Sequence, residues 1–115
     1  MSISFGGIGE MCVTMKTSGT VAKGSPVKLC ANGTVTACSA GDRLVGVVVD
    51  KAEDGYATVQ LAGFAEVGYT GTAPSVGFGL LGADGSGGVK TVASGGGEYV
   101  IVTVDTAAKT VGFII

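Results

Sequence analysis

The chain has 115 residues and a mass of 11.2 kDa, which is the size of one domain. It has no histidine, which excludes Ser-His-Asp or Cys-His catalysis, zinc sites with His ligands and an imidazole pH switch. Its seven basic residues are scattered among nine acidic ones, and the net charge is −2. Nucleic-acid binding requires clustered positive charge, so we expect no direct nucleic-acid partner.

The composition predicts an all-β protein. Val contributes 17 residues, Thr 12 and Ile 5, whereas Leu contributes only 5. Branching at Cβ restricts χ1 and suits a pleated sheet better than a helix. The 22 glycines would destabilise any helix that contained them and are typical of tight turns. We therefore expect a small β-barrel or β-sandwich, since the same alternation serves both.

Strands are predicted along most of the chain. Residues 1–10 show little regular pattern and are expected to form a flexible arm or loop. Apolar and β-branched runs then predict strands at Met11–Met15, Pro26–Ala31, Thr34–Cys38, Leu44–Val49, Tyr56–Leu61, Phe64–Val67, Phe78–Leu81, Val89–Val92, Glu98–Asp105 and Thr110–Ile115. Asn32-Gly33 is a strong hairpin signal, and Gly63 is expected to mark a bulge or bend. Alternation places Val100, Val102 and Val104 on one face.

Two segments of the chain, 26–61 and 78–115, resemble each other in pattern. Each has a short strand, a turn (Ala31-Asn32-Gly33 or Ala83-Asp84-Gly85), a second short strand and a valine-rich strand that ends in Val-Asp. A further hairpin strand completes each unit. The repeat predicts two similar β-units within a single domain spanning 1–115, packed around one shared core.

The three cysteines do not form a disulfide framework, because their number is odd and no Cys-x-x-Cys pair is present. If Asn32-Gly33 is a two-residue turn, Cys30 lies opposite Val35 and Val27 lies opposite Cys38. Cys30 and Cys38 then point to opposite faces of the hairpin. We expect all three cysteines to be reduced and buried as small hydrophobic side chains.

No motif predicts catalysis. Gly77–Gly82 fits the dinucleotide pattern G-x-G-x-x-G, but the glycine-rich stretch that follows cannot form the helix which that site requires. Asp84-Gly85-Ser86 has a single carboxylate, so a turn is a better interpretation than a calcium loop. The remaining carboxylates lie mostly at strand ends or in turns, where Asp bonds local N–H groups. We expect no enzyme activity, no catalytic residues, no cofactor and no metal.

The sequence does not suggest membrane insertion or secretion. Its densest apolar run, Val45–Val49, is far shorter than the roughly 18–20 residues of a spanning helix. The chain does not open with a basic segment followed by an apolar one, so we expect no signal peptide.

The low charge content points instead to a protein partner. Charged residues make up 14% of the chain, against roughly 25% in an ordinary soluble domain. We expect part of the surface to be covered in the working state, by copies of the chain or by a larger partner. The candidate partner-binding residues are Ile3, Phe5 and Ile8 of the arm, which could order as an added strand on binding.

Three stretches resemble small head proteins of phages and prophages: Val21–Val27, Gly41–Val48 and Val102–Phe113. The chain is similar to capsid decoration (cement) or head-fibre-type proteins from Val21 to Ile115. The resemblance implies a β-barrel-like subunit, commonly a homotrimer, that binds the lattice of the major capsid protein and stabilises the head. It also implies a virion location, with assembly in the bacterial cytoplasm. A tail component is an alternative within this class.

A carrier domain is an alternative from another class. Val49-Asp50-Lys51-Ala52 resembles the Asp-Lys-Ala segment of lipoyl- and biotinyl-type carriers, which are also small glycine-rich β-proteins with an internal repeat. Lys51 would then be the modified residue. The chain departs from that pattern in having Val48-Val49 before Asp50.

Overall fold

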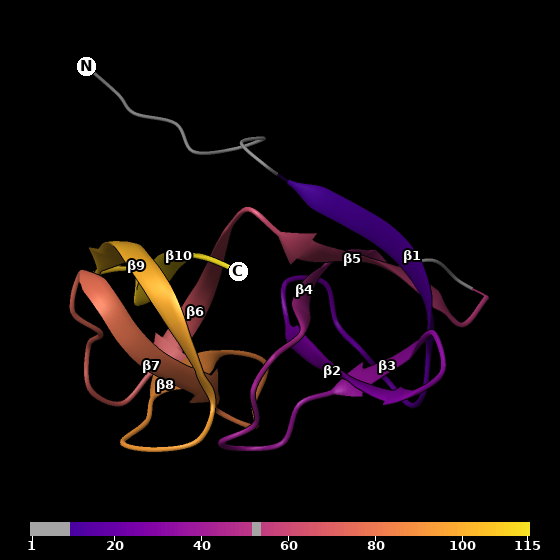
Figure 1. Ribbon diagram of the computed structural model, residues 1–115, viewed down its shortest axis with the longest axis horizontal. Helices are drawn as coiled ribbons and strands as arrows, with labels where there is room; N and C mark the ends of the chain where they lie inside the picture. The colour runs from indigo at the N-terminus through magenta and orange to yellow at the C-terminus, as the bar shows by residue number, and fades with distance from the viewer. Residues whose placement is uncertain (1–9, 52–53) are drawn as a thin grey trace.

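The computed structural model describes residues 10–51 and 54–115, and this part of the chain is all-β (Figure 1). The first half contains β1 (Met11–Thr17), β2 (Pro26–Ala31), β3 (Thr34–Ala37), β4 (Gly46–Lys51) and β5 (Tyr56–Ala62). The second half contains β6 (Phe64–Thr70), β7 (Gly77–Ala83), β8 (Val89–Thr91), β9 (Gly97–Asp105) and β10 (Thr110–Ile114). The predicted all-β class is confirmed, and every predicted strand is present with ends shifted by a few residues.

The strands close into two barrels with the same topology, ordered β1-β3-β2-β4-β5 and β6-β8-β7-β9-β10 around each barrel. In both, the first strand runs antiparallel to the fifth and parallel to the third. The two barrels lie side by side, joined at Gly63, where a φ of +97° turns the chain between β5 and β6 (Figure 1). The predicted repeat is therefore present, but each unit begins one strand earlier than expected, at β1 and at β6.

Each barrel has its own apolar core, so the prediction of a single shared core is wrong. The core of the first barrel consists of Val21, Val27, Val35, Val48, Ala57 and Val59. The second barrel has a larger core, centred on Phe113 and Leu81, and Leu44 and Val47 of the first half belong to it. The two cores stay separate because five short strands close a barrel whose interior is filled by its own side chains. Leu44 and Val47 link the first half to the second core.

The β2–β3 hairpin forms at Asn32-Gly33, but its register differs from the predicted one. Ala31 pairs with Thr34 as expected, whereas the next pair is Leu29 with Val35, because Cys30 is an extra residue in the ladder. Of the two turn residues, only Gly33 has a positive φ, of +59°. A turn of this kind is accompanied by a bulge on one strand. As a result Val27 lies opposite Ala37 and not opposite Cys38.

In β9, the residues that point into the barrel are Tyr99 and Ile101, and Val100 points outward. The register of β9 against β10 shifts beside Val102, since Gly112 pairs with Thr103 and Phe113 with Ile101. The predicted valine face is thus interrupted by a bulge. Val104 packs against the second core, while Val100 remains exposed. No helix in residues 10–51 or 54–115 is long and apolar enough to cross a membrane.

Lys109 has a strained backbone and yields a stability prediction. It is exposed, with a φ of +56°, and is the single non-glycine residue in the described part of the chain with a positive φ. A left-handed conformation costs an L-residue about 1–2 kcal/mol, which glycine avoids. We expect Lys109→Gly to raise the free energy of unfolding by about 0.5–1 kcal/mol in urea titrations. The control is Lys23→Gly, because Lys23 is an exposed turn residue without a positive φ, and this substitution should lower the free energy of unfolding. A decrease of the same size in both variants would contradict the prediction.

Candidate functional site

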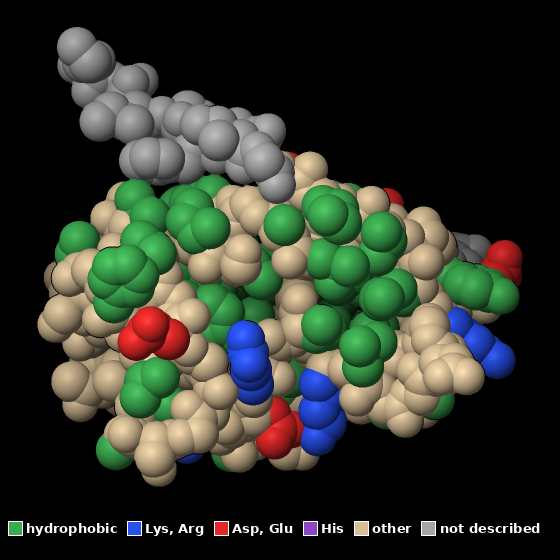
Figure 2. Space-filling model, viewed as in Figure 1, with side chains coloured by type: hydrophobic (Ala, Val, Ile, Leu, Met, Phe, Trp, Pro, Cys, Tyr) green, Lys and Arg blue, Asp and Glu red, His purple; other side chains and the backbone are tan. Residues whose placement is uncertain are grey.

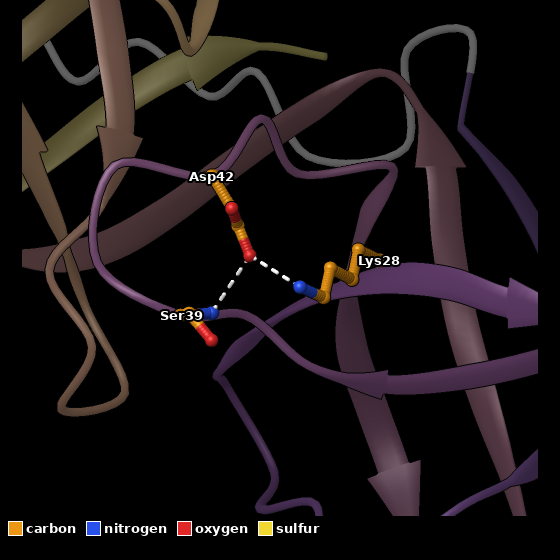
Figure 3. A network of polar contacts seen from close by, with 3 residues as sticks. All are labelled: Lys28, Ser39 and Asp42. Carbon is orange, nitrogen blue, oxygen red and sulfur yellow. Dashed lines mark hydrogen bonds and ion pairs between the residues drawn. The ribbon is translucent and has the colours of Figure 1, made fainter.

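The loop between β3 and β4 connects the two barrels and is held by Asp42. The Asp42 carboxylate accepts a hydrogen bond from Lys28 Nζ at 2.6 Å and one from the main-chain N–H of Ser39 at 2.9 Å (Figure 3). Main-chain hydrogen bonds then join this loop to β7, from Gly41 N to Ala83 O at 2.8 Å and from Ala83 N to Asp42 O at 2.9 Å. The loop therefore fixes one barrel against the other.

The ion pair gives an acid-dependent stability prediction. The hydrogen bond from Lys28, followed by that from Ser39, lowers the pKa of Asp42 below its ordinary value of 3.8. A lowered pKa in the folded state means that the stabilisation is present above pH 3.8 and is lost as the pH falls through the lowered pKa. We expect Asp42→Asn to be less stable at pH 7 and to lose less further stability on acidification than the wild type. Urea titrations between pH 2 and pH 7 measure this difference.

The matched variant for this prediction is Lys28→Gln, which removes the other partner. Asp42 raises the pKa of Lys28 through the same hydrogen bond, so this contribution is also lost above pH 10.5. In a double-mutant cycle the two substitutions should be less than additive, because each removes the same contact. Full additivity at pH 7 would show that the pair does not act as a unit.

Tyr99 of β9 also joins the second barrel to the loop between β3 and β4. Its hydroxyl donates a hydrogen bond to the main-chain oxygen of Leu44 at 3.2 Å. Burial raises the pKa of Tyr99, and the neighbouring Arg43 opposes part of that rise. Gly97 leaves the space for this arrangement, because a Cβ there would lie 2.8 Å from Tyr99 Oη and 3.1 Å from Arg43 Cγ.

A groove of about 620 Å³ opens between the barrels, beside Tyr99 and Leu44. Most of the side chains that line it are apolar. They come from both barrels: Leu29, Val45 and Leu61 from the first, and Phe78, Val100 and Ile114 from the second. The charged lining residues are Lys28, Arg43 and Glu98. Figure 2 shows a face of the molecule on which hydrophobic side chains of both halves lie around a few charged ones. A groove of this kind suits an apolar protein surface better than a charged ligand.

The repeat shows why part of the groove wall is uncovered. Val47 pairs with Gln60 between β4 and β5, and Val100 pairs with Ile114 between β9 and β10. Each of these pairs lies next to a pair of core residues, so the two pairs occupy equivalent positions in the two barrels. Val47 and Gln60 are 6% and 7% exposed, because this side of the first barrel packs toward the second. Val100 and Ile114 are 39% and 38% exposed. This surface is therefore covered on the first barrel, whereas the equivalent surface of the second barrel is apolar and exposed.

The residues predicted to bind a partner are Ile3, Phe5 and Ile8, which fall outside the described residues. Lys51, proposed for a carrier domain, ends β4, where it pairs with Ala57; its side chain and Ala52 also lie outside the description. Sequence reasoning missed Phe78, which is 78% exposed. Its position between Gly77 and Gly79 was the available signal, since a large aromatic residue flanked by glycines has little beside it to cover it.

The remaining motifs have structural roles. Gly77–Gly82 lies within β7, as the strand interpretation predicted. Asp84 Oδ1 accepts hydrogen bonds from the N–H groups of Ser86 and Gly88, at 2.6 and 3.0 Å, which confirms the predicted turn. In the described part of the chain, no group of three or more Cys, Asp or Glu side chains could hold a metal ion.

The cysteines are free thiols, but the prediction that all three are buried is wrong. Cys12 and Cys30 are exposed, the first on an exposed strand and the second as the bulge residue of β2. Cys38 is half-buried, and burial together with the charge of Asp42 raises the pKa of its thiol to about 11. Cys38 is therefore protonated at neutral pH and has no nucleophilic character.

Comparison with known proteins finds no match to any protein-family model and no curated protein with a matching sequence.

Proposed function

We propose that the protein is a structural virion component that binds the outer surface of a phage head as an oligomer and stabilises the capsid. The observation that carries the proposal is the open apolar groove between the barrels, with Phe78 at 78% exposure on its wall. Large exposed apolar patches on a soluble protein mark surfaces that bind other proteins. The resemblance to capsid decoration proteins supplies the class of partner.

The structure supports attachment by many modest contacts. The groove offers aliphatic and aromatic side chains, with Arg43 and Glu98 at its sides to fix the orientation of a partner. Contacts of this size give moderate affinity for one subunit. When several linked subunits meet a repeating lattice, the later contacts become intramolecular and the overall affinity rises by orders of magnitude. A decoration protein can therefore hold a capsid firmly without a large interface for each subunit.

The test is co-sedimentation with expanded capsids that lack a decoration protein, prepared from the virus or prophage that encodes the chain. We expect the wild type to bind at micromolar concentration. Phe78→Ser should weaken binding about 10–100-fold, because burying a Phe side chain contributes about 1.5–3 kcal/mol. Val76→Ser is the matched control: Val76 is 69% exposed in the loop before β7 but does not line the groove, and its substitution should leave binding unchanged.

The outcomes separate the alternatives. Absence of binding to capsids at micromolar wild-type protein would count against a head protein, and binding to purified tails would place the chain in the tail. Equal losses for Phe78→Ser and Val76→Ser would show that the groove is not the contact surface. The intact mass of the protein from its native host tests the carrier alternative, which requires an added group on Lys51.

A further inference from the structure

The edge of β2 that faces β4 is paired only at its start. The ladder between the two strands covers Pro26 and Val27 alone. Beyond this point the chain that leads into β4 turns away from β2, because Leu44 packs in the core of the second barrel. Within residues 10–51 and 54–115, no strand therefore pairs with this edge of β2 at Leu29.

The main-chain groups of Leu29 point toward this open edge. Val27 O accepts a hydrogen bond from the segment before β4, whereas Pro26 O accepts one from the residue after β3. Hydrogen-bonding groups of successive residues point to alternate edges of a strand, so Leu29 follows Val27 and Lys28 follows Pro26. Leu29 is 53% exposed and lines the groove. An edge with free N–H and C=O groups is a template for pairing with a further strand.

The equivalent edge in the second barrel is covered by an extended segment of chain. Leu29 corresponds to Ala83, because each pairs with the valine that contacts the first strand of its barrel. Ala83 O accepts a hydrogen bond from Gly41 N–H at 2.8 Å, and Ala83 N–H donates one to Asp42 O at 2.9 Å. Ala83 is only 1% exposed as a result. The repeat therefore predicts an extended segment at Leu29 as well.

The N-terminal arm joins the described part of the chain at this same end of the first barrel. Met11 of β1 pairs with Ala62, and the neighbouring Leu61 lines the groove together with Leu29. Figure 1 shows that β1 begins on the side of the first barrel that faces the second. Nine residues precede Glu10, and an extended segment of this length spans up to about 30 Å. The arm is therefore long enough to reach the open edge of β2.

The chemistry of the arm matches this edge and the wall beside it. Residues 1–9 carry no charged side chain. Ile3 and Phe5 are two residues apart, which places both on one face of an extended segment. The groove wall beside Leu29 is apolar, since Val45 and Leu61 also contribute to it. An apolar strand would bury its side chains on this wall while its main chain pairs with β2.

We propose that the arm, residues 1–9, pairs as an added strand with the open edge of β2 in the same chain. Its main-chain hydrogen bonds at Leu29 match those that the β3–β4 loop makes at Ala83, and Phe5 packs on the first-barrel wall of the groove. The short connection to β1 favours the same chain over a second copy, because it keeps the arm at a high local concentration. The inference does not rest on the proposed function, since it concerns the free protein and leaves Phe78, on the second barrel, to the partner.

The test is amide hydrogen exchange, measured by NMR on the full chain and on a chain that lacks residues 1–9. We expect the N–H of Leu29 to exchange at least about tenfold faster in the truncated chain, because its hydrogen bond to the arm is lost. The N–H of Lys28 points toward β3 and is the control in the same strand; its rate should change less than about twofold. Equal rates for Leu29 in the two chains would overturn the proposal.

A tryptophan in the arm gives a second readout, because the chain has none. We expect Phe5→Trp to fluoresce at a shorter wavelength than tryptophan in water, and Leu29→Ser in the same chain to shift that emission to longer wavelength. Val76→Ser is the control, since Val76 is exposed but does not line the groove, and it should leave the emission unchanged. Emission typical of exposed tryptophan at every protein concentration would overturn the proposal. A shift to longer wavelength on dilution would also overturn it, because the arm of a second copy would then fill the site.

Discussion

Phe113→Ala is expected to lower the free energy of unfolding by about 3–5 kcal/mol, as is usual for the loss of a fully buried Phe side chain. Phe113 has no exposed surface and is the largest fully buried side chain in the described part of the chain. Its ring packs against that of Tyr99, with the ring centroids 5.2 Å apart and the planes tilted by 59°. A cavity at this point removes that contact from the second core, which also contains Leu44 and Val47 of the first half.

Chemical denaturation followed by circular dichroism measures this effect, with Ile114→Ala as the control. Ile114 is the next residue in β10, but its side chain faces the groove and is 38% exposed. We expect its truncation to cost no more than about 1.5 kcal/mol, since less apolar surface is returned to water. Similar decreases in the free energy of unfolding for the two variants would mean that the side chains of β10 do not alternate between the core and the groove.

The positions of the strands follow from local physical chemistry, which is why they could be predicted. Gly33 supplies the positive φ of the β2–β3 turn, and β-branched side chains define the strands on either side. The bulge at Cys30 could not be predicted in the same way. It adds one residue to one strand only, and it depends on how the turn twists the hairpin. One extra residue was enough to make the predicted pairings of Cys30 and Val27 wrong.

The number of barrels could not be predicted from the sequence either, for a different reason. Alternation within a strand shows which side chains share a face, but it does not show whether that face packs inside its own barrel or against the other barrel. Val47 and Val100 occupy equivalent positions, yet one is buried and the other lies on the groove. What separates them is the packing of one barrel against the other, which no local pattern encodes.

The candidate site illustrates the same limit. Leu29 and Leu61 of the first barrel meet Phe78 and Val100 of the second across the groove, so its lining is contributed by strands far apart in the chain. Low charge content predicted that a partner covers part of the surface, and the exposed Phe78 lies on one candidate for that surface. It could not say where that surface lies, and the candidate residues chosen from the sequence were those of the arm.

Gly46→Ala is expected to cost about 3 kcal/mol, although it adds a single methyl group. Gly46 begins β4 and is buried where this strand crosses β5. A Cβ at this position would overlap the main-chain oxygen of Gln60 and lie 2.8 Å from Cγ1 of Val59. The oxygen cannot move aside, because β4 and β5 are held in register by the pairs of Val47 with Gln60 and Val48 with Val59. Relief therefore requires the two strands to separate, which disturbs the core of the first barrel.

Gly79→Ala provides the matched control, since Gly79 also lies in a strand and has no positive φ. The atom nearest to a Cβ at Gly79 is Cδ1 of Ile101, at 2.8 Å, which is the far end of a flexible side chain. A rotation of Ile101 relieves the contact, and alanine is favoured over glycine within a strand, so we expect a change within about 1 kcal/mol. Urea titrations of both variants test the contrast. A small effect at Gly46 would mean that β4 and β5 can separate without cost, and the closed first barrel would then be a looser structure than its pairing indicates.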